Sequence, residues 1–272
     1  MPTISQLSRE TEIRSAVSRD QLALVYQPIV DISNLRVVGF EALTRWKHPR
    51  FGLVMPGEFI PLAVETGAIG QIEEWILFGA CQQARVWQEI FGDGLKISIN
   101  LSAPEFSRPD FISHLGTVLE KTGADPASLE LEITETTLMD NEEITQINLH
   151  SLRELGIDVA IDDFGVGYSS LNYLTRFEID RIKVDKSFVD EITNSKSFLV
   201  LQAVIDLGRN LGLNITAEGV EGEQQLQRLR LAKCQNGQGF LFHKPLESLQ
   251  VTELLESGAH LKPEPIRLLR AV

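Results

Sequence analysis

The chain has 272 residues, of which 43% are hydrophobic and 23% charged, and its net charge is −13 at neutral pH. This composition is typical of a globular protein, and no apolar run approaches the roughly 18 residues that cross a bilayer. The acidity excludes the broad basic surface that binds a nucleic-acid polymer, but it permits a small anionic substrate where metal ions supply positive charge locally.

The N-terminal residues 1–20 are polar and lack the apolar core of a secretory signal, so we expect a cytoplasmic protein without a membrane segment. The first two predicted strands follow at 22–30 and 36–43. Only DISNL at 31–35 separates them. This is hairpin spacing and too short for a parallel crossover, so the two strands are predicted to be antiparallel.

Six further runs rich in β-branched residues are predicted strands, at 95–102, 129–135, 158–164, 181–185, 214–220 and 237–242. Helical patterns, such as residues 111–123 and 197–212, separate most of them. Strands that alternate with helices indicate βαβ units and a parallel sheet. About eight such units in a chain of this length close most naturally as a barrel.

The predicted fold class is therefore α/β, a TIM-type (β/α)8 barrel with an antiparallel first strand pair. No linker rich in proline, glycine or serine interrupts the pattern. We expect one domain over residues 1–260 and a C-terminal tail over 261–272.

In such a barrel, side chains at the carboxyl ends of the strands converge on one mouth. All but one of the predicted strands carry polar residues there: Glu41, Asn100, Glu132, Asp162 with Asp163, Lys183 with Asp185, Glu218 and Gln238. A ring of carboxylates costs too much desolvation to be accidental unless cations compensate for it. Glu130 lies near the start of its strand, away from the mouth, and is expected to be structural.

Asp162 and Asp163 are neighbours, although successive side chains on a strand point to opposite faces. We therefore predict that the strand ends at Asp162 and that the turn with Gly165 and Gly167 swings Asp163 toward a second ion.

The metal at this mouth is expected to have oxygen ligands. Cys81 and Cys234 form no C-x-x-C pair, and the histidines never recur at the H-E-x-x-H spacing. Carboxylates with an amide oxygen favour Mg²⁺ or Mn²⁺. Two such ions roughly 3.5–4 Å apart suit the cleavage of a phosphodiester.

Eight short motifs occur in one order along the chain: YQPIVD (26–31), EALTRW (41–46), NLS (100–102), EITE (132–135), DDFGVGYSSL (162–171), IKVDKSFV (182–189), AEGVE (217–221) and QGFLFHKP (238–245). By these motifs the chain resembles the EAL-domain family of cyclic-di-GMP-specific phosphodiesterases. The resemblance implies a barrel that hydrolyses cyclic di-GMP to linear pGpG with two Mg²⁺ or Mn²⁺ ions in bacterial second-messenger signalling. Ca²⁺ is expected to inhibit, because it prefers looser and higher coordination.

The resemblance also implies roles for individual residues. The metal ligands would be Glu41, Asn100, Glu132, Asp162, Asp163, Asp185 and Glu218. The catalytic residues would be Glu41, Lys183, Glu135 and Glu218. The substrate contacts would be Gln27, Leu43, Arg45, Asn100, Asp162, Glu221, Gln238 and Phe240. Glu135 would support the 162–171 loop, and Lys183 would either accept a proton from water or stay charged and position that water.

Three positions depart from the family pattern. Val166 stands where threonine is usual, Phe240 where tyrosine is commoner, and His243 where a small residue is frequent. None of them removes a metal ligand, but Val166 puts the turnover rate in question.

Two other functions remain open. One is a catalytically weak or inactive receptor for cyclic di-GMP, and the other is a metal phosphodiesterase for glycerophosphodiesters. The family commonly dimerises through helices beside the 162–171 loop, so a homodimer is expected. A fused sensory or cyclase domain in a longer parent protein is a further candidate partner.

Overall fold

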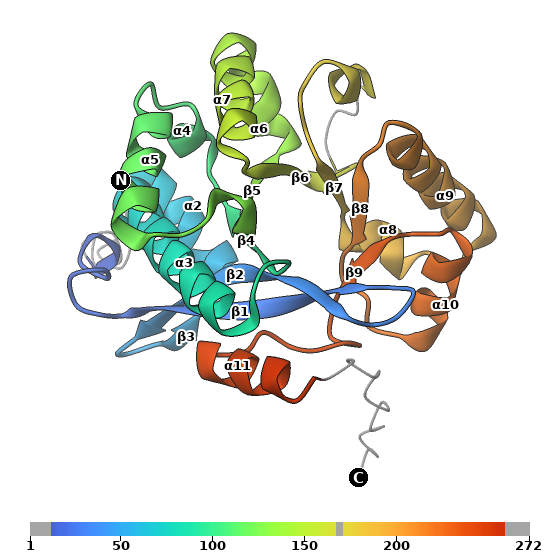
Figure 1. The fold of residues 1–272 in the computed structure, drawn as a ribbon, viewed down its shortest axis with the longest axis horizontal. Helices are drawn as coiled ribbons and strands as arrows, with labels where there is room; N and C mark the ends of the chain where they lie inside the picture. The colour runs from blue at the N-terminus through green and yellow to red at the C-terminus, as the bar shows by residue number, and fades with distance from the viewer. Residues whose placement is uncertain (1–11, 167–170, 259–272) are drawn as a thin grey trace.

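The computed structural model describes residues 12–166 and 171–258, which form a closed barrel (Figure 1). Nine strands make one sheet in the order β1-β9-β8-β7-β6-β5-β4-β2-β3, and the pairing of β1 with β2 closes it, with β3 left outside. The strands are β1 (Leu22–Asp31), β2 (Val37–His48), β3 (Gly52–Val54), β4 (Lys96–Asn100), β5 (Leu129–Thr134), β6 (Asp158–Phe164), β7 (Arg181–Val184), β8 (Asn214–Ala217) and β9 (Asn236–Gln238). The predicted barrel is confirmed.

Helices surround this barrel (Figure 1). They are α2 (Pro56–Thr66), α3 (Ile69–Phe91), α4 (Ala103–Phe106), α5 (Phe111–Thr122), α6 (Glu135–Asp140), α7 (Glu142–Leu155), α8 (Lys186–Asp190), α9 (Ser195–Asn210), α10 (Glu223–Leu231) and α11 (Ser248–Glu256), with short 3-10 turns η1 (Pro126–Ser128) and η2 (Leu171–Thr175). Helix α3 packs through Trp87, whose ring centroid lies 4.8 Å from that of Tyr26 on β1. The Trp87 indole donates to Thr252 Oγ1 at 3.1 Å and so ties α11 to the same side of the barrel.

The first strand pair is antiparallel, as the short connection predicted. Strand β1 pairs antiparallel with both β2 and β9, whereas the other neighbouring strands of the closed barrel run parallel. Asp31 fixes the turn because its carboxylate accepts hydrogen bonds from the backbone amide of Ser33 at 2.7 Å and that of Asn34 at 3.3 Å.

The eight predicted runs correspond to β1, β2 and β4 to β9, but β3 was not predicted. It has three residues and pairs with the end of β2, where Trp46 lies opposite Val54. A strand this short has no alternation to detect, and β2 also extends five residues beyond the run predicted at 36–43.

The prediction that the strand ends at Asp162 is wrong. Strand β6 continues through Asp163 to Phe164, with an irregularity against β7 between Ile161 and Phe164. Asp163 has a φ of 53°, in the left-handed region, so its side chain is redirected by a bulge within the strand. Gly165 continues the turn with a φ of 95°, while Gly167 lies outside the described residues.

The predicted tail at 261–272 also lies outside the described residues. Within 12–166 and 171–258, no helix has both the length and the apolar character needed to traverse a bilayer.

Candidate active site

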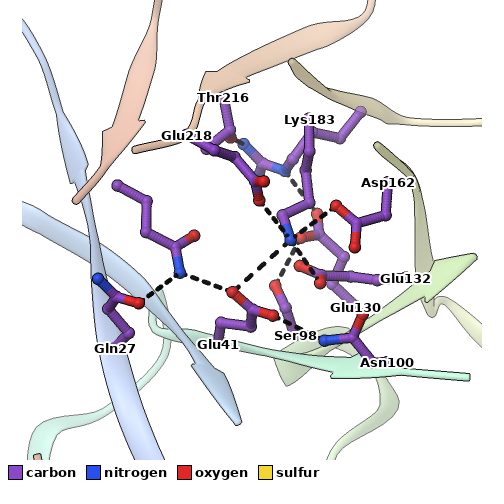
Figure 2. A network of polar contacts seen from close by, with 12 residues as sticks. Gln27, Glu41, Ser98, Asn100, Glu130, Glu132, Asp162, Lys183, Thr216 and Glu218 are labelled. Atoms are coloured by element: carbon purple, nitrogen blue, oxygen red, sulfur yellow. Dashed lines mark hydrogen bonds and ion pairs between the residues drawn. The ribbon is translucent and has the colours of Figure 1, made fainter. Parts of the chain in front are cut away.

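The carboxyl ends of the barrel strands gather acidic side chains around one buried amine, that of Lys183 (Figure 2). Lys183 lies on β7 and is 1% exposed. Its Nζ atom is close to four carboxylates: Glu132 Oε2 at 2.6 Å, Glu218 Oε1 at 2.7 Å, Asp162 Oδ1 at 3.1 Å and Glu41 Oε2 at 3.7 Å. The structure thus brings together residues from five separate segments of the sequence.

Strand register places these residues within two positions of one another at the same end of the barrel. Asn100 lies opposite Glu132 across β4 and β5, and Asp162 lies opposite Thr134 across β5 and β6. Asn100 Nδ2 also donates to Glu41 Oε1 at 2.7 Å, which connects β4 to β2. Because side chains alternate along each strand, residues two positions apart share the barrel interior.

The mouth holds more negative than positive charge. Burial lowers the pKa of Lys183, but Asp162, Glu132 and the other two carboxylates outweigh burial and raise it well above its ordinary value. Burial raises the pKa of Glu132 well above its usual range, against the attraction of Lys183. Burial likewise raises the pKa of Glu218 to about 8. The carboxylates therefore favour binding a further cation or a proton.

Several features of the mouth fit a divalent cation. Asp162, Asp163 and Glu218 each present a carboxylate oxygen, and these oxygens lie within 4.8 Å of one another. Glu132 Oε1 is buried and has no hydrogen-bond partner within 12–166 and 171–258. The donors are all oxygen atoms, which Mg²⁺ and Mn²⁺ prefer.

Asp185, the remaining predicted ligand, lies beside this group. Its charge contributes to the raised pKa of Asp163, after the larger effects of burial and Asp162. Asp185 also precedes α8, where its Oδ1 accepts from the amide of Ser187 at 2.9 Å. Its assignment as a metal ligand stays a prediction.

A second polar layer lies in the barrel interior below the mouth. Glu130 Oε2 accepts from Arg181 Nε at 2.6 Å, and its Oε1 accepts from Ser98 Oγ at 2.7 Å. Arg181 Nη1 also donates to Thr216 Oγ1 at 3.2 Å. In this layer, one carboxylate faces one guanidinium and both of its oxygens have partners. Such pairing is consistent with the structural role expected of Glu130.

A cleft of about 310 Å³ opens beside the mouth. It is lined by Gln27, Glu41, Asp162, Lys183, Lys186, Glu218, Gly219, Glu221, Gln238, Gly239 and Phe240. Gln238 Nε2 donates to Glu41 Oε2 at 2.6 Å and to Gln27 Oε1 at 3.3 Å, which connects the cleft wall to the carboxylates. Phe240 is 54% exposed and offers an aromatic surface.

Lys186 is a cleft residue that the sequence reasoning missed. It pairs with Glu221, and the Glu221 hydrogen bond raises the pKa of Lys186. Its place directly after Asp185 was the available signal, because residues just beyond a barrel strand face the mouth.

Leu43, Arg45 and Asn100 are the three predicted substrate contacts that do not line this cleft. Leu43 borders a neighbouring apolar cavity of about 420 Å³. Arg45 is buried, and its Nη1 donates to the carbonyl oxygen of Thr44 at 2.9 Å. Burial lowers the pKa of Arg45 and the nearby Glu41 opposes that effect. All three contacts stay predictions.

Glu135 begins α6 and is buried close to both sides of the 162–171 loop. Burial raises its pKa, and the Gly165 amide and the Tyr173 hydroxyl oppose this effect. Neither group completes a hydrogen bond to the Glu135 oxygens, which have no partner among the described residues. The carboxylate thus lies where the loop leaves β6 and where it returns at η2.

Residues 10–245 match the family model described as "EAL domain". The chain is 40% identical over 247 residues to "Bifunctional diguanylate cyclase/cyclic di-GMP phosphodiesterase MucR" of Pseudomonas aeruginosa, a match that covers 90% of this chain and 36% of the relative. It is 40% identical over 265 residues to "Cyclic di-GMP phosphodiesterase NbdA" of the same organism, covering 97% and 34%.

A solved structure, "PaMucR Phosphodiesterase, c-di-GMP complex", superposes with a TM-score of 0.86 at 40% identity and covers 90% of this chain and 99% of that one. The chain spans about a third of the length of the two curated relatives.

Proposed function

The chain belongs to the EAL domain family, and from this premise we propose that it hydrolyses cyclic di-GMP to linear pGpG as a divalent-metal phosphodiesterase. One observation carries the proposal: four carboxylates lie around Lys183 at the mouth, and one of them, Glu132, has an oxygen with no partner in the described part of the chain. An excess of buried negative charge is costly unless a cation offsets it.

In the proposed reaction, two Mg²⁺ or Mn²⁺ ions would be held by Glu41, Asn100, Glu132, Asp162, Asp163, Asp185 and Glu218. When bound, such ions acidify a water molecule and stabilise negative charge on phosphate oxygens. The other parts of the reaction fall to the side chains of this protein.

Lys183 is proposed to act as a charged donor that positions the attacking water. Its ammonium group touches carboxylates from four other segments, and their charges raise its pKa well above the ordinary value. In this protonation state the ammonium group can donate a hydrogen bond to an oxygen atom and so orient it. Of the two roles left open by the sequence, this contact geometry favours positioning.

The cleft residues are proposed to bind the dinucleotide. Phe240 offers an exposed ring on which a guanine can stack, and Lys186 supplies a cation that suits a phosphate. Gln27 and Gln238 would fix the substrate beside Glu41, because both line the cleft and Gln238 donates to Glu41. Leu43 would contribute from the wall of the neighbouring cavity, Arg45 from the same strand, and Glu221 from the edge where it pairs with Lys186.

Glu135 is proposed to hold the 162–171 loop in its active shape. Its buried carboxylate lies near Gly165 and Tyr173, on the two sides of that loop. Asp163 is on the same strand end, so a loop that shifts would also shift this candidate ligand.

The test is to incubate the purified chain with cyclic di-GMP and Mg²⁺ and to follow linear pGpG by chromatography. The proposal predicts product with Mg²⁺ or Mn²⁺, none with chelator, and inhibition by Ca²⁺. Binding of the dinucleotide without any product would contradict hydrolysis and favour the receptor. Hydrolysis of a glycerophosphodiester that cyclic di-GMP does not inhibit would favour the other phosphodiesterase.

We also propose a cytoplasmic homodimer, formed beside the 162–171 loop. Val166, Leu199 and Val200 are exposed apolar residues, and Val200 lines a groove with Gly165 and Phe188. An apolar surface of this kind commonly marks an interface. Sedimentation that shows a monomer at every concentration would refute the dimer. Because the curated relatives are longer, a sensory or cyclase domain attached to this one is part of the same proposal.

A further inference from the structure

Glu73 is a buried carboxylate that belongs to none of the family motifs recognised in the sequence. It lies on α3, outside the barrel, and is 5% exposed. It borders the apolar cavity of about 420 Å³ together with Leu43, Ile76 and Leu101. A carboxylate in such surroundings is costly to desolvate, so packing alone gives no reason for it.

The Glu73 carboxylate holds the backbone just after Asn100. Its Oε1 accepts from the amide of Ser102 at 2.6 Å, and its Oε2 accepts from Ser102 Oγ at 2.9 Å. Ser102 precedes α4, but its side chain does not cap that helix and donates to Glu73 instead. The preceding amide, that of Leu101, donates to the carbonyl oxygen of Glu132 at 2.9 Å.

Both amides after Asn100 are therefore tied, one to β5 and one to α3. Asn100 is the last residue of β4, and its side chain reaches Glu41 in the mouth. A ligand at a strand end keeps its geometry only if the chain that follows is held in place.

We propose that Glu73 is a positioning residue, which through Ser102 fixes Asn100 in the metal-binding mouth. The inference rests on the proposed function, because it concerns a ligand of the proposed metal site. Glu73 acts on the backbone two residues from Asn100 and touches no metal ligand itself.

The free-energy cost of burying the Glu73 carboxylate indicates a role other than stabilising the fold. Burial raises the pKa of Glu73 to about 7, against the lowering effect of the Ser102 hydrogen bonds, and Glu105 raises it further. An apolar side chain at this position would avoid the cost of burying the charge.

The test measures Mn²⁺ binding by calorimetry in the native chain and in three variants, with urea unfolding as a parallel measurement. Glu73→Leu removes both hydrogen bonds, and we expect Mn²⁺ affinity to fall about 10- to 100-fold while the chain stays folded. Glu73→Gln keeps an acceptor for the Ser102 amide and offers a donor to its hydroxyl, so affinity should return to within about threefold of native. Glu105→Gln is the matched control, because Glu105 is buried nearby and pairs with Arg108 rather than Ser102, so its affinity should be native.

Native affinity in a folded Glu73→Leu variant would overturn the inference, and so would a Glu73→Gln variant as weak as Glu73→Leu. If Glu73→Leu fails to fold, Ser102→Ala decides: it removes one of the two bonds and should weaken Mn²⁺ binding by about threefold or more, whereas native affinity would refute the role. A native chain that binds no Mn²⁺ would overturn this inference and the proposed function together. Binding by the native chain with no loss in the variants would overturn this inference alone.

Discussion

Two polar layers lie one above the other inside the barrel. Buried charge is balanced in the lower layer and unbalanced in the upper one. In the lower layer, Glu130 faces Arg181, and each Glu130 oxygen accepts a hydrogen bond. In the upper layer, four carboxylates share the single ammonium group of Lys183, and Glu132 Oε1 has no partner among the described residues. Glu130 and Glu132 lie two residues apart on β5, and Arg181 and Lys183 two residues apart on β7. The upper layer also takes Glu41 from β2 and Asp162 from β6.

Burial of an acidic side chain does not by itself identify a functional site. Glu130 and Glu132 are both 1% exposed and both point into the barrel. They differ in whether their charge and hydrogen-bonding capacity are satisfied by the protein. A satisfied pair holds strands together, whereas an unsatisfied cluster is suited to bind a cation.

Substitutions in the two layers should differ most in their effect on the hydrolysis rate. Glu41→Ala removes a proposed ligand, and we expect the rate of pGpG formation to fall about 10³-fold or more, since metal stabilisation of the transition state is worth several kcal/mol. Glu130→Gln in the lower layer should change the rate by less than about tenfold, because Glu130 lies outside the mouth. Steady-state assays at saturating Mg²⁺ compare the two. Equal losses would break the distinction between the layers.

The second prediction separates the layers by stability. Lys183→Met and Arg181→Met each leave buried carboxylates without their cation, and each should lower the free energy of unfolding by about 3–5 kcal/mol without metal. Mn²⁺ should restore much of the loss in Lys183→Met, because it binds the same carboxylates, but little of it in Arg181→Met. Urea unfolding with and without Mn²⁺ gives both values. Rescue of both variants, or of neither, would contradict the account.

The structure also tells us how much of this could be read from the sequence. Alternating polar residues on predicted strands located Glu41, Glu132, Asp162 and Lys183 correctly at one mouth, because strand period and barrel topology leave little choice. The pairing of these side chains with one another could not be predicted from the sequence. That Arg181 neutralises Glu130 across the barrel depends on side chains from non-adjacent strands, which no local pattern encodes.

Local backbone irregularity was the other limit. The bulge at Asp163 was mistaken for a strand end, because the sequence shows only that two adjacent aspartates cannot share a face. Strand β3 was not predicted because three residues are too few to show the alternation of polar and apolar side chains that marks a strand. Glu73 was overlooked because a single acid on an amphipathic helix resembles any surface glutamate until its burial is known.

The third prediction concerns pH. The pKa of Glu218 is raised to about 8 in the folded protein, so the folded state holds a proton that the unfolded chain releases near its ordinary value. This contribution to stability is fully present below the unfolded pKa and is lost as pH rises through the folded pKa. Titration of Glu218 alone should therefore lower the free energy of unfolding of the metal-free protein between about pH 5 and 8, by at most about 1.4 kcal/mol per pH unit.

Glu218→Gln should flatten this pH dependence, and saturating Mn²⁺ should abolish it because the ions hold the carboxylates ionised. Urea titrations at several pH values measure the slope. A metal-free protein that gains stability across the same range would show that the upper layer is not over-supplied with negative charge.

The smallest expected effect lies at the loop beside the mouth. Val166 is 65% exposed, and its amide donates to the carbonyl oxygen of Asp163 at 3.2 Å. Val166→Thr adds a hydroxyl to the turn that orients Asp163, and we expect kcat to rise by about two- to threefold, the value of one exposed hydrogen bond. Leu249→Thr, on α11 and exposed to a similar extent at 69%, is the control. An unchanged kcat would show that Val166 does not lower the turnover rate.

Anomalous scattering from a crystal grown with Mn²⁺ tests whether the upper layer is a metal site. We expect Mn²⁺ to bind in the upper layer, with Glu41, Glu132, Asp162 and Glu218 among its ligands, and none to bind between Glu130 and Arg181. An upper layer without Mn²⁺ at saturating concentration, with Lys183 still surrounded by its carboxylates, would contradict it.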